Sequence, residues 1–384
     1  MTQGWSHKKL GEVCVLQRGF DLPKGYRKSG LVPLISSSGR SDYHDEAKVK
    51  GPGVVTGRSG SIGKVFFIEE DFWPLNTTLY VKEFYGNYPR FVAYLLNSFD
   101  LSRYTSGAGV PTLNRNHVHD ELVFVPESVE EQKRIVAILD QTFADLDQAR
   151  ATAETNLKNA RELFDSYLQQ VFSQRGEGWV EAKLGDLLDI GSSKRIYETD
   201  WTKSGVPFFG GKEIVQLAKY GTVVSNAYIS EEKYLEYASK YDMPKKGDIL
   251  MTARGTIGVG YIVQEGDKFY YKDGNIISLR QKKPTNPQFI LYAFKTKQIL
   301  DQIERLTGTT VNHLPLRAAK EIVLSIPNYD AQNVIVSKIK EMETNIQHLV
   351  RIYEKKLLAV DELKKSILQK AFTGELTKSK GIAA

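Results

Sequence analysis

Several loop-like segments of this sequence are rich in side chains that can hydrogen-bond to the edges of DNA bases. Arginine suits guanine, asparagine suits adenine, and serine or threonine suits either base. Such residues gather at 38–42 and 112–117 in the first half of the chain, and at 192–195, 210–212 and 309–313 in the second half. For each of them, a solvated loop without any contact to nucleic acid is the alternative interpretation. The candidate DNA-binding residues are Arg40, Arg58, Ser59, Lys64, Asn114, Arg115, Asn116, His117, Lys194, Arg195, Lys212, Arg254, Thr256, Asn312 and His313.

A glycine-rich segment at 57–64 has some features of a nucleotide-binding loop but lacks its chemistry. A P-loop needs a Ser or Thr after its lysine, so that a hydroxyl reaches the metal ion while backbone amides cradle the phosphates. Here Val65 follows Lys64, and the related segment at 247–258 has no lysine at all. We therefore interpret both segments as tight turns between strands, in which glycine permits a positive φ. Arg58 and Arg254 recur beside these turns, either in an ion pair or as contacts to phosphate or guanine.

Motifs that would indicate catalysis are missing from the sequence. An amino-methyltransferase would show an Asp/Asn-Pro-Pro-aromatic motif with a glycine-rich cofactor loop, and neither is found. Glu-x-Lys fragments at 46–48 and 181–183 have no convincing upstream acid to complete a nuclease site. His117 and His119 stand without the further ligands that a metal site needs. We expect no cofactor or metal site in this chain, and keep a stand-alone nuclease or methyltransferase and a coiled-coil protein adaptor as alternatives.

The sequence predicts two long helices more clearly than any other element. Apolar residues recur at steps of three and four over 135–171 and again over 335–371, which is the pattern of a helix with one apolar stripe. Such a stripe needs a partner helix, so the two are expected to pair. Ser128 and Glu131 form a capping-box pattern at the start of the first helix.

The two helices belong to an internal repeat. Gln132 and Phe172 return 200 residues later as Gln332 and Phe372. The globular segments in front of the helices open alike, with Gly-Trp and Leu-Gly-Glu/Asp, and share the glycine-rich turn, whereas residues 20–50 and 194–245 differ freely. A shared frame with divergent loops suggests one fold that reads two targets. The predicted domains are 1–127 and 178–328, each followed by a long helix, at 128–177 and 329–376, with a tail at 377–384.

Within each globular segment, short β-branched and aromatic runs alternate with Gly, Pro, Asn and Asp. We predict strands at 65–68, 78–81 and 276–279, and helices at 89–97 and 287–300. The predicted fold class is α+β: two pseudo-repeated α/β globular domains, with mostly antiparallel or mixed sheets, joined by two long helices in an antiparallel coiled coil.

Composition fits a soluble protein. The 384 residues carry a net charge of +6, which is compatible with nucleic-acid binding without requiring it. Cys14 is the one cysteine, and neither a transmembrane span nor a secretory signal is recognisable in the sequence. We expect a cytoplasmic protein.

As a set, these landmarks resemble the specificity (S) subunit of type I restriction–modification systems. The resemblance is carried by Gly-Trp with Leu-Gly-Glu/Asp opening each half, by the Thr-x-Arg-(x)-Gly-x-Ile-Gly turn, and by the helix start at 126–135 and its closing Leu-Gln-x-x-Phe. It implies a sequence-specific, non-catalytic DNA reader whose two target-recognition domains each read one half of a bipartite, asymmetric site in double-stranded DNA. It also implies that the paired helices act as a spacer between those domains.

The resemblance further implies partners. Two methyltransferase (M) subunits would dock on the helices and neighbouring regions, and restriction/translocase (R) subunits would join the full complex. S-adenosylmethionine would then belong to the M subunits and ATP to the R subunits. The second copy departs from the pattern at Ala331, which stands where the first copy has Glu131, so an equivalent capping contact there is not expected.

Overall fold

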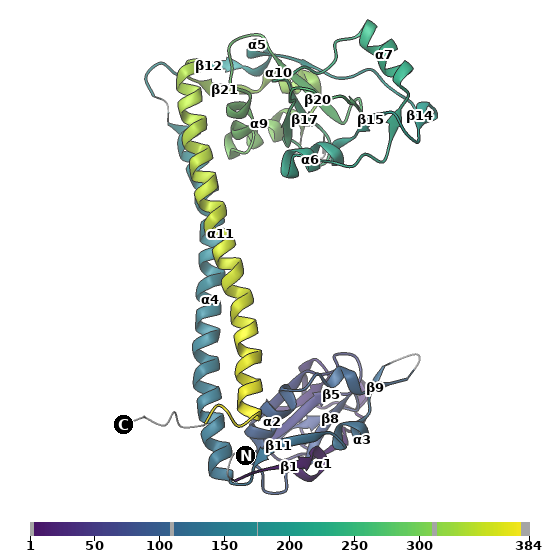
Figure 1. The fold of residues 1–384 in the computed structure, drawn as a ribbon, viewed down its shortest axis with the longest axis vertical. Coiled ribbons are helices and arrows are strands. Elements are labelled where there is room, and N and C mark those ends of the chain that lie inside the picture. The colour runs from purple at the N-terminus through teal and green to yellow at the C-terminus, as the bar shows by residue number, and fades with distance from the viewer. Residues whose placement is uncertain (1–3, 108–110, 175, 309–312, 378–384) are drawn as a thin grey trace. The chain divides into compact units, whose positions relative to one another are not determined.

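The computed structural model describes residues 4–107, 111–174, 176–308 and 313–377. The chain divides into two compact units, unit 1 with Met1–Thr155 and Glu354–Ala384, and unit 2 with Asn156–Tyr353. Each unit contains part of both long helices, α4 (Val129–Ser173) and α11 (Tyr329–Phe372) (Figure 1). Both helices lie where the apolar stripes predict them.

Unit 1 is a mixed α+β domain. Its strands are β1 (Trp5–Lys9), β2 (Val15–Arg18), β3 (Val32–Ser36), β4 (Gly39–His44), β5 (Gly53–Gly57), β6 (Val65–Ile68), β7 (Trp73–Pro74), β8 (Thr78–Glu83), β9 (Thr105–Ser106), β10 (Thr112–Leu113) and β11 (Leu122–Pro126). Its shorter helices are α1 (Leu10–Val13), α2 (Pro89–Asn97), α3 (Arg115–His119) and the 3-10 helices η1 (Lys24–Tyr26) and η2 (Leu101–Tyr104).

The central sheet of unit 1 has the order β2-β8-β5-β6, and all its neighbouring strands are antiparallel. A second sheet, β4-β3-β7, contains one parallel pair, β3 with β7, and a two-stranded ribbon joins β1 to β11. The main core lies between the central sheet and α2, where Leu16, Val54 and Phe91 are buried together. The prediction of mostly antiparallel or mixed sheets is confirmed.

Unit 2 repeats this frame with different connections. Its strands are β12 (Val180–Lys183), β13 (Leu188–Gly191), β14 (Trp201–Thr202), β15 (Val206–Phe209), β16 (Tyr228–Ile229), β17 (Ile249–Thr252), β18 (Gly260–Ile262), β19 (Tyr270–Tyr271), β20 (Ile276–Gln281) and β21 (Val323–Ile326). Its shorter helices are η3 (Glu198–Asp200), α5 (Leu184–Leu187), α6 (Gly211–Tyr220), α7 (Glu231–Lys240), α8 (Pro287–Ala293), α9 (Lys297–Thr307) and α10 (Leu316–Glu321).

The central sheets of the two units have matching strand orders, and two further strand pairs also correspond. The order β13-β20-β17-β18 matches β2-β8-β5-β6, the ribbon β12–β21 matches β1–β11, and the parallel pair β15–β19 matches β3–β7. The units differ in the segments between these landmarks. Unit 2 inserts α6 and α7 near β15 and β16, where unit 1 has the β3–β4 hairpin.

The long helices pair antiparallel within each unit. In unit 1, Phe143 of α4 and Ile367 of α11 pack on one apolar cluster, and Arg150 Nη1 lies 2.5 Å from an Asp361 carboxylate oxygen. In unit 2, Leu168 of α4 and Ile339 of α11 share the other main cluster. The early part of α4 therefore meets the late part of α11 in unit 1, and the reverse holds in unit 2. This arrangement confirms the predicted coiled-coil pairing.

Two local predictions at helix ends need correction. The helix predicted at 287–300 is two helices, α8 and α9, because the Thr296 hydroxyl bonds the Ala293 carbonyl at 2.6 Å and the chain turns there. The Ser128 hydroxyl makes no capping bond among the described contacts; only its carbonyl is engaged, by the Gln132 N–H at 3.1 Å. In the second copy, the Asn328 side chain accepts the Ala331 N–H at 2.9 Å and caps α11.

The glycine-rich segments are turns between antiparallel strands, as predicted. The first joins β5 to β6 and the second joins β17 to β18. Gly60 and Gly63 have φ of +80° and +86°, and Gly255 and Gly258 have φ of +75° and +88°. Side chains other than glycine rarely adopt this backbone conformation, which explains the recurring glycines. Among the described residues, no helix combines the length and apolar character needed to cross a membrane.

Candidate nucleic-acid interface

In unit 1, the turn after β5 lies beside the polar segment that precedes α3. The N–H groups of Arg58 and Ser59 donate to the Thr77 carbonyl at 2.9 and 3.2 Å, and the Arg58 carbonyl accepts the Leu113 N–H at 2.8 Å. Ser59 also forms an isolated β-bridge with Thr112. The structure thus brings together the candidates at 58–59 and those at 114–117, which are far apart in the sequence.

Unit 2 has the same arrangement at the corresponding turn. Arg254 forms a β-bridge with His313, and the Leu314 N–H donates to the Ala253 carbonyl at 2.7 Å. The candidates Arg254 and His313 are therefore neighbours. Asn312 lies outside the described residues.

Neither turn arginine is held in an ion pair. Among the described residues, no carboxylate lies within salt-bridge distance of Arg58 or Arg254. Arg254 is exposed and Arg58 is half-buried. The ion-pair interpretation of these arginines therefore has no support, and both guanidinium groups remain available for a ligand.

In the segment that leads into α3, some polar side chains hold the local structure and others face solvent. The Asn114 side-chain oxygen caps the helix by accepting the Asn116 N–H at 3.1 Å, and Arg115 Nη1 donates to the Leu16 carbonyl at 3.5 Å. Asn116 and His117 are exposed, and the Asn114 amide nitrogen lies 3.5 Å from the His117 ring. Two of the four candidates here thus have structural bonds, and two present their side chains to solvent.

His119 has a structural role next to this segment. Its Nε2 accepts the Leu16 N–H at 2.8 Å, which requires a neutral ring. Burial, reinforced by the charge of Arg115, lowers the pKa of His119 below its ordinary value of 6.5. Among the described residues, no group of three or more His, Cys, Asp or Glu side chains is placed to hold a metal ion.

Arg40 and Lys64 lie on other parts of unit 1. Arg40, on β4, forms an ion pair with Glu70. The Lys64 side chain is exposed, and its carbonyl accepts the Gly57 N–H at 3.2 Å to close the turn. No described contact joins Arg40 to the turn at Arg58.

A polar cleft in unit 1 contains residues that the sequence did not single out. It has a volume of about 520 Å³ and lies between the loop after β2 and the segment just before β8. Thr77 lines it and also accepts from Arg58, so the cleft continues into the turn. Arg27 bonds Asp42 at 2.9 Å, which holds the pKa of that carboxyl below its usual value. The lining residues are Asp21, Leu22, Pro23, Lys24, Arg27, Ser36, Ser41, Leu75, Asn76 and Thr77.

Unit 2 has a cleft of about 310 Å³ between the loop after β13, the segment after α7, and strands β19 and β20. The candidate Lys194 lines it, with its ammonium group 5.4 Å from the ring centre of Tyr241 and its backbone bonded to the Tyr270 hydroxyl at 3.0 Å. Arg280 is bound to Asp248 at 2.7 Å. Both clefts adjoin the loop after the first strand of the central sheet, at different places, and three tyrosines line only the one in unit 2.

The remaining candidates in unit 2 are more scattered. Arg195 pairs with Asp273 at 3.0 Å beside the cleft. Lys212 is exposed in the first turn of α6, and Thr256 is exposed in the turn after β17, where its carbonyl accepts the Thr252 hydroxyl.

A family model for the type I restriction modification DNA specificity domain matches this chain twice, at residues 2–155 and 176–355. The chain belongs to this family. Among known proteins, it is 27% identical to a putative type I restriction enzyme specificity subunit of Haemophilus influenzae, over 88% of this chain and 87% of that protein.

Two solved structures share its fold. A chain from a structure of the type I R-M system, reported for its complex assembly and conformational transition, superposes with a TM-score of 0.77 at 18% identity, covering 98% of this chain and 99% of that one. The HsdS subunit of Thermoanaerobacter tengcongensis superposes with a TM-score of 0.65 at 18% identity, with 98% of each chain covered.

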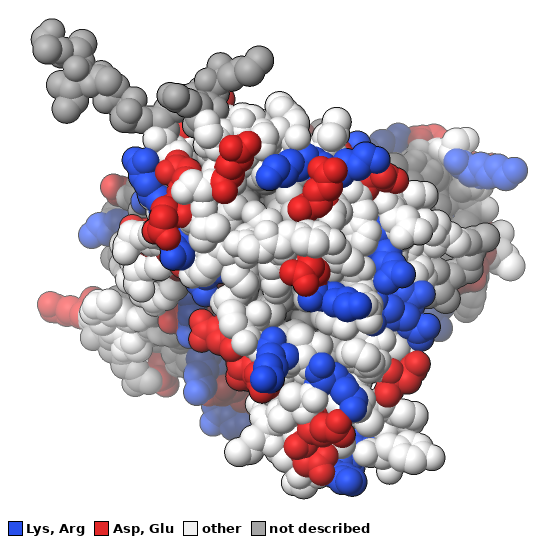
Figure 2. All heavy atoms as spheres, turned by 90° about the horizontal axis from the view of Figure 1, so that it is seen from below, with Lys and Arg blue, Asp and Glu red and all other residues white. Residues whose placement is uncertain are grey.

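The charge on this specificity subunit is mixed rather than concentrated. On the face of unit 1 in the foreground of Figure 2, Lys and Arg side chains are interspersed with Asp and Glu. A large basic patch on that face is therefore not what attracts a nucleic acid.

Proposed function

We propose that each unit of this specificity subunit reads one half of a bipartite, asymmetric site in double-stranded DNA. The observation that supports the proposal is the recurrence of one glycine turn in both units, with Arg58 or Arg254 beside it and a β-bridge to a polar segment, while the segments between the shared strands differ. A common frame would present each turn to DNA in the same way, while different side chains select different bases. Two different readers give a site that need not be palindromic.

Base and phosphate contacts are assigned to exposed and half-buried groups around each turn and cleft. In unit 1 these are Arg58, Ser59, Lys64, Asn116 and His117, with Asn114 and Arg115 holding the segment in place. In unit 2 they are Lys194, Arg195, Lys212, Arg254, Thr256 and His313. Arg40 is the weakest of the candidates because its guanidinium is already paired with Glu70.

We also propose that the paired helices fix the gap between the half-sites and dock methyltransferase subunits. Both long helices carry apolar side chains that neither unit buries: Leu163 on α4, and Val334, Leu349, Leu358 and Leu363 on α11. These side chains supply apolar surface that a docked subunit could cover. The chain itself is proposed to catalyse neither methyl transfer nor cleavage, with those reactions belonging to partner subunits.

Selection of bound duplexes from a random pool tests the proposal. The full chain, together with its methyltransferase subunit, should enrich a motif of two specified parts separated by a fixed number of unspecified base pairs. A single continuous motif would contradict the two-reader proposal, and the absence of any enriched motif would favour a protein adaptor. Incubation of the isolated chain with DNA and labelled S-adenosylmethionine should transfer no label, because the stand-alone enzyme is the rival that predicts transfer.

A further inference from the structure

The strand pairing in front of the glycine turns shows which residues of the two units are equivalent. In unit 1, Gly57 lies opposite Thr78, the first residue of β8. In unit 2, Thr252 lies opposite Ile276, the first residue of β20. Gly57 and Thr252 each come three residues before the first positive-φ glycine of their turn, so they occupy the same place in the shared frame.

The next residue is Arg58 in unit 1 and Ala253 in unit 2, and their carbonyls make the same bond. The Arg58 carbonyl accepts the Leu113 N–H at 2.8 Å. The Ala253 carbonyl accepts the Leu314 N–H at 2.7 Å. In the sequence, Arg58 and Arg254 look equivalent because each stands beside its glycine turn. The structure corrects this, since Arg254 lies one residue further along its turn than Arg58 does.

Arg254 is instead equivalent to Ser59. In unit 1, Ser59 forms an isolated β-bridge with Thr112. In unit 2, Arg254 forms an isolated β-bridge with His313. Both bridge partners come shortly before a short helix, α3 in unit 1 and α10 in unit 2. One place beside this polar segment therefore carries a serine in unit 1 and an arginine in unit 2.

The place shared by Ser59 and Arg254 is open to a ligand. Arg254 is exposed and Ser59 is half-buried, whereas the preceding place holds the buried Ala253 in unit 2. Successive side chains of an extended segment point to opposite sides, so the two places face different surroundings. Among the described residues, no hydrogen bond or ion pair engages the Arg254 guanidinium or the Ser59 hydroxyl. Both groups are therefore available to DNA.

On the basis of the proposed function, we infer that this place determines base specificity in both readers, with Arg254 recognising a guanine and Ser59 imposing no such requirement. A guanidinium donates two hydrogen bonds to the O6 and N7 acceptors of guanine, whereas a single hydroxyl suits more than one base. Arg58 is then a contact that only unit 1 has, because Ala253 stands at its place in unit 2.

Moving the unit 1 arginine by one residue tests this assignment. The double variant Arg58→Ala/Ser59→Arg gives unit 1 the Ala-Arg pair of unit 2. The full chain, with its methyltransferase subunit, is used to select duplexes from a random pool. Compared with Arg58→Ala alone, the double variant should gain a preference for guanine of about five- to a hundredfold at one base pair of one half-motif. The other half-motif should not change.

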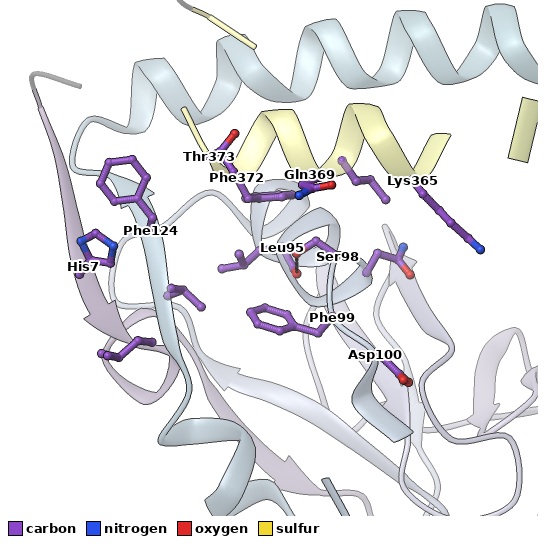
Figure 3. A pocket seen from close by; sticks show the side chains of 14 residues that line it. His7, Leu95, Ser98, Phe99, Asp100, Phe124, Lys365, Gln369, Phe372 and Thr373 are labelled. Atoms are coloured by element: carbon purple, nitrogen blue, oxygen red, sulfur yellow. Dashed lines mark hydrogen bonds between the residues drawn. The ribbon is translucent and has the colours of Figure 1, made fainter. Parts of the chain in front are cut away.

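A charge-matched variant separates base reading from general attraction to DNA. Arg58→Ala/Gln369→Arg has the same net charge as the double variant, but its new arginine lies elsewhere in unit 1. Gln369 is exposed on α11 and lines a groove between α11 and the end of α2 (Figure 3), to which no residue of the turn at 57–64 contributes. This variant should gain no preference for guanine, because an added charge attracts DNA of any sequence.

The reciprocal change is made in unit 2. Arg254→Ser gives unit 2 the serine of unit 1 and should remove a preference for guanine at one base pair of the other half-motif. Arg305→Ser removes the same charge from an exposed position on α9 and should leave every base preference unchanged. Both replaced side chains are exposed, so circular dichroism should show the melting curve of the unchanged chain for both variants.

Two results would overturn this assignment while the unchanged chain still selects a two-part motif, which leaves the proposed function standing. One is uniform weakening of binding by Arg254→Ser with no change in base preference, since the arginine would then contact phosphate. The other is a double variant that melts as Arg58→Ala does and gains no preference for guanine; if it does not fold, Arg254→Ser decides alone. If the unchanged chain selects no two-part motif, the proposed function fails and this assignment fails with it.

Discussion

The side-chain oxygen of Gln132 accepts the backbone N–H of Tyr88 at 2.8 Å, and this bond joins the first turn of α4 to the N-terminus of α2. The Gln132 amide nitrogen donates to Asn87 at 2.7 Å and to the Pro126 carbonyl at 3.2 Å. Gln332 repeats the arrangement in unit 2, accepting the Asn286 N–H at 2.8 Å and donating to Pro327 at 2.9 Å.

Both glutamines are 1% exposed. Each one hydrogen-bonds a backbone N–H and a backbone carbonyl that would otherwise be left without a partner. They recur at the same place in the repeat because each globular domain has the same joint to its long helix. Under the proposed spacer role, a rigid joint would let the helix pair fix the gap between the two half-sites.

Replacing this joint should destabilise one unit at a time. Gln132→Leu leaves the Tyr88 N–H buried without an acceptor, and we expect unit 1 to lose about 2 kcal/mol or more of its free energy of unfolding. Gln332→Leu should do the same to unit 2. Hydrogen exchange followed by mass spectrometry measures the two units separately. Gln148→Leu, at an exposed position of α4, is the control and should change protection by less than about 0.5 kcal/mol. Equal protection in all three variants would show that the buried amide is not a joint.

Placing a charged residue on the apolar stripe of α4 tests the pairing of the two long helices. Leu146 is half-buried on α4, close in sequence to Asp147, which pairs with Lys364 of α11. Leu146→Asp should loosen the helix pair, and DNA selection should then lose the fixed gap while each half-motif is retained. Ala359→Asp changes an exposed residue on the partner helix that is not among the apolar groups proposed for docking, so the pairing and the gap should persist. A fixed gap in the Leu146→Asp variant would rule out the spacer role of these helices.

The long helices and the turns could be predicted from sequence because their signals are local. Apolar residues at steps of three and four identify α4 and α11, and the recurring glycines identify turns that need a positive φ. The break between α8 and α9 was missed because Phe294, Lys295 and Thr296 carry no Gly or Pro signal; a threonine hydroxyl ends the helix there.

The binding surface was harder to predict because it is assembled from distant segments. Thr77, Arg27 and Asp42 line or support the unit 1 cleft, yet nothing in the sequence pairs them. The internal repeat did single out Gln132. Its structural role could not be predicted, because the residue it bonds, Tyr88, is distant in sequence and is brought close only by the fold.

Acid should weaken unit 1 through His119. Its pKa is lowered in the folded state by burial and by Arg115, so below its ordinary value of 6.5 the unfolded chain takes up a proton that the folded ring resists. The free energy of unfolding should therefore fall as the pH drops through 6.5 and level off once the folded ring also protonates. Urea unfolding from pH 7.5 to pH 5, roughly the range of a histidine, measures this slope. His119→Gln should flatten it, and His117→Gln, at an exposed ring, should not. The same slope in both variants would assign the proton uptake to other groups.

Replacing the arginine beside each glycine turn should affect one half of the proposed DNA site at a time. Arg58 lies in unit 1 and Arg254 in unit 2, each beside its glycine turn and without an ion pair among the described residues. A bidentate arginine–guanine contact contributes about 1–3 kcal/mol to base discrimination, so Arg58→Ala should relax one half of the selected motif and Arg254→Ala the other. If an arginine contacts phosphate instead, binding should weaken uniformly across sequences and become less sensitive to salt. Arg134→Ala, on α4 away from both turns, is the control for loss of a positive charge. If either turn variant relaxed both half-motifs, or if neither variant changed affinity or salt dependence, the assignment of one reader to each unit through these arginines would be wrong.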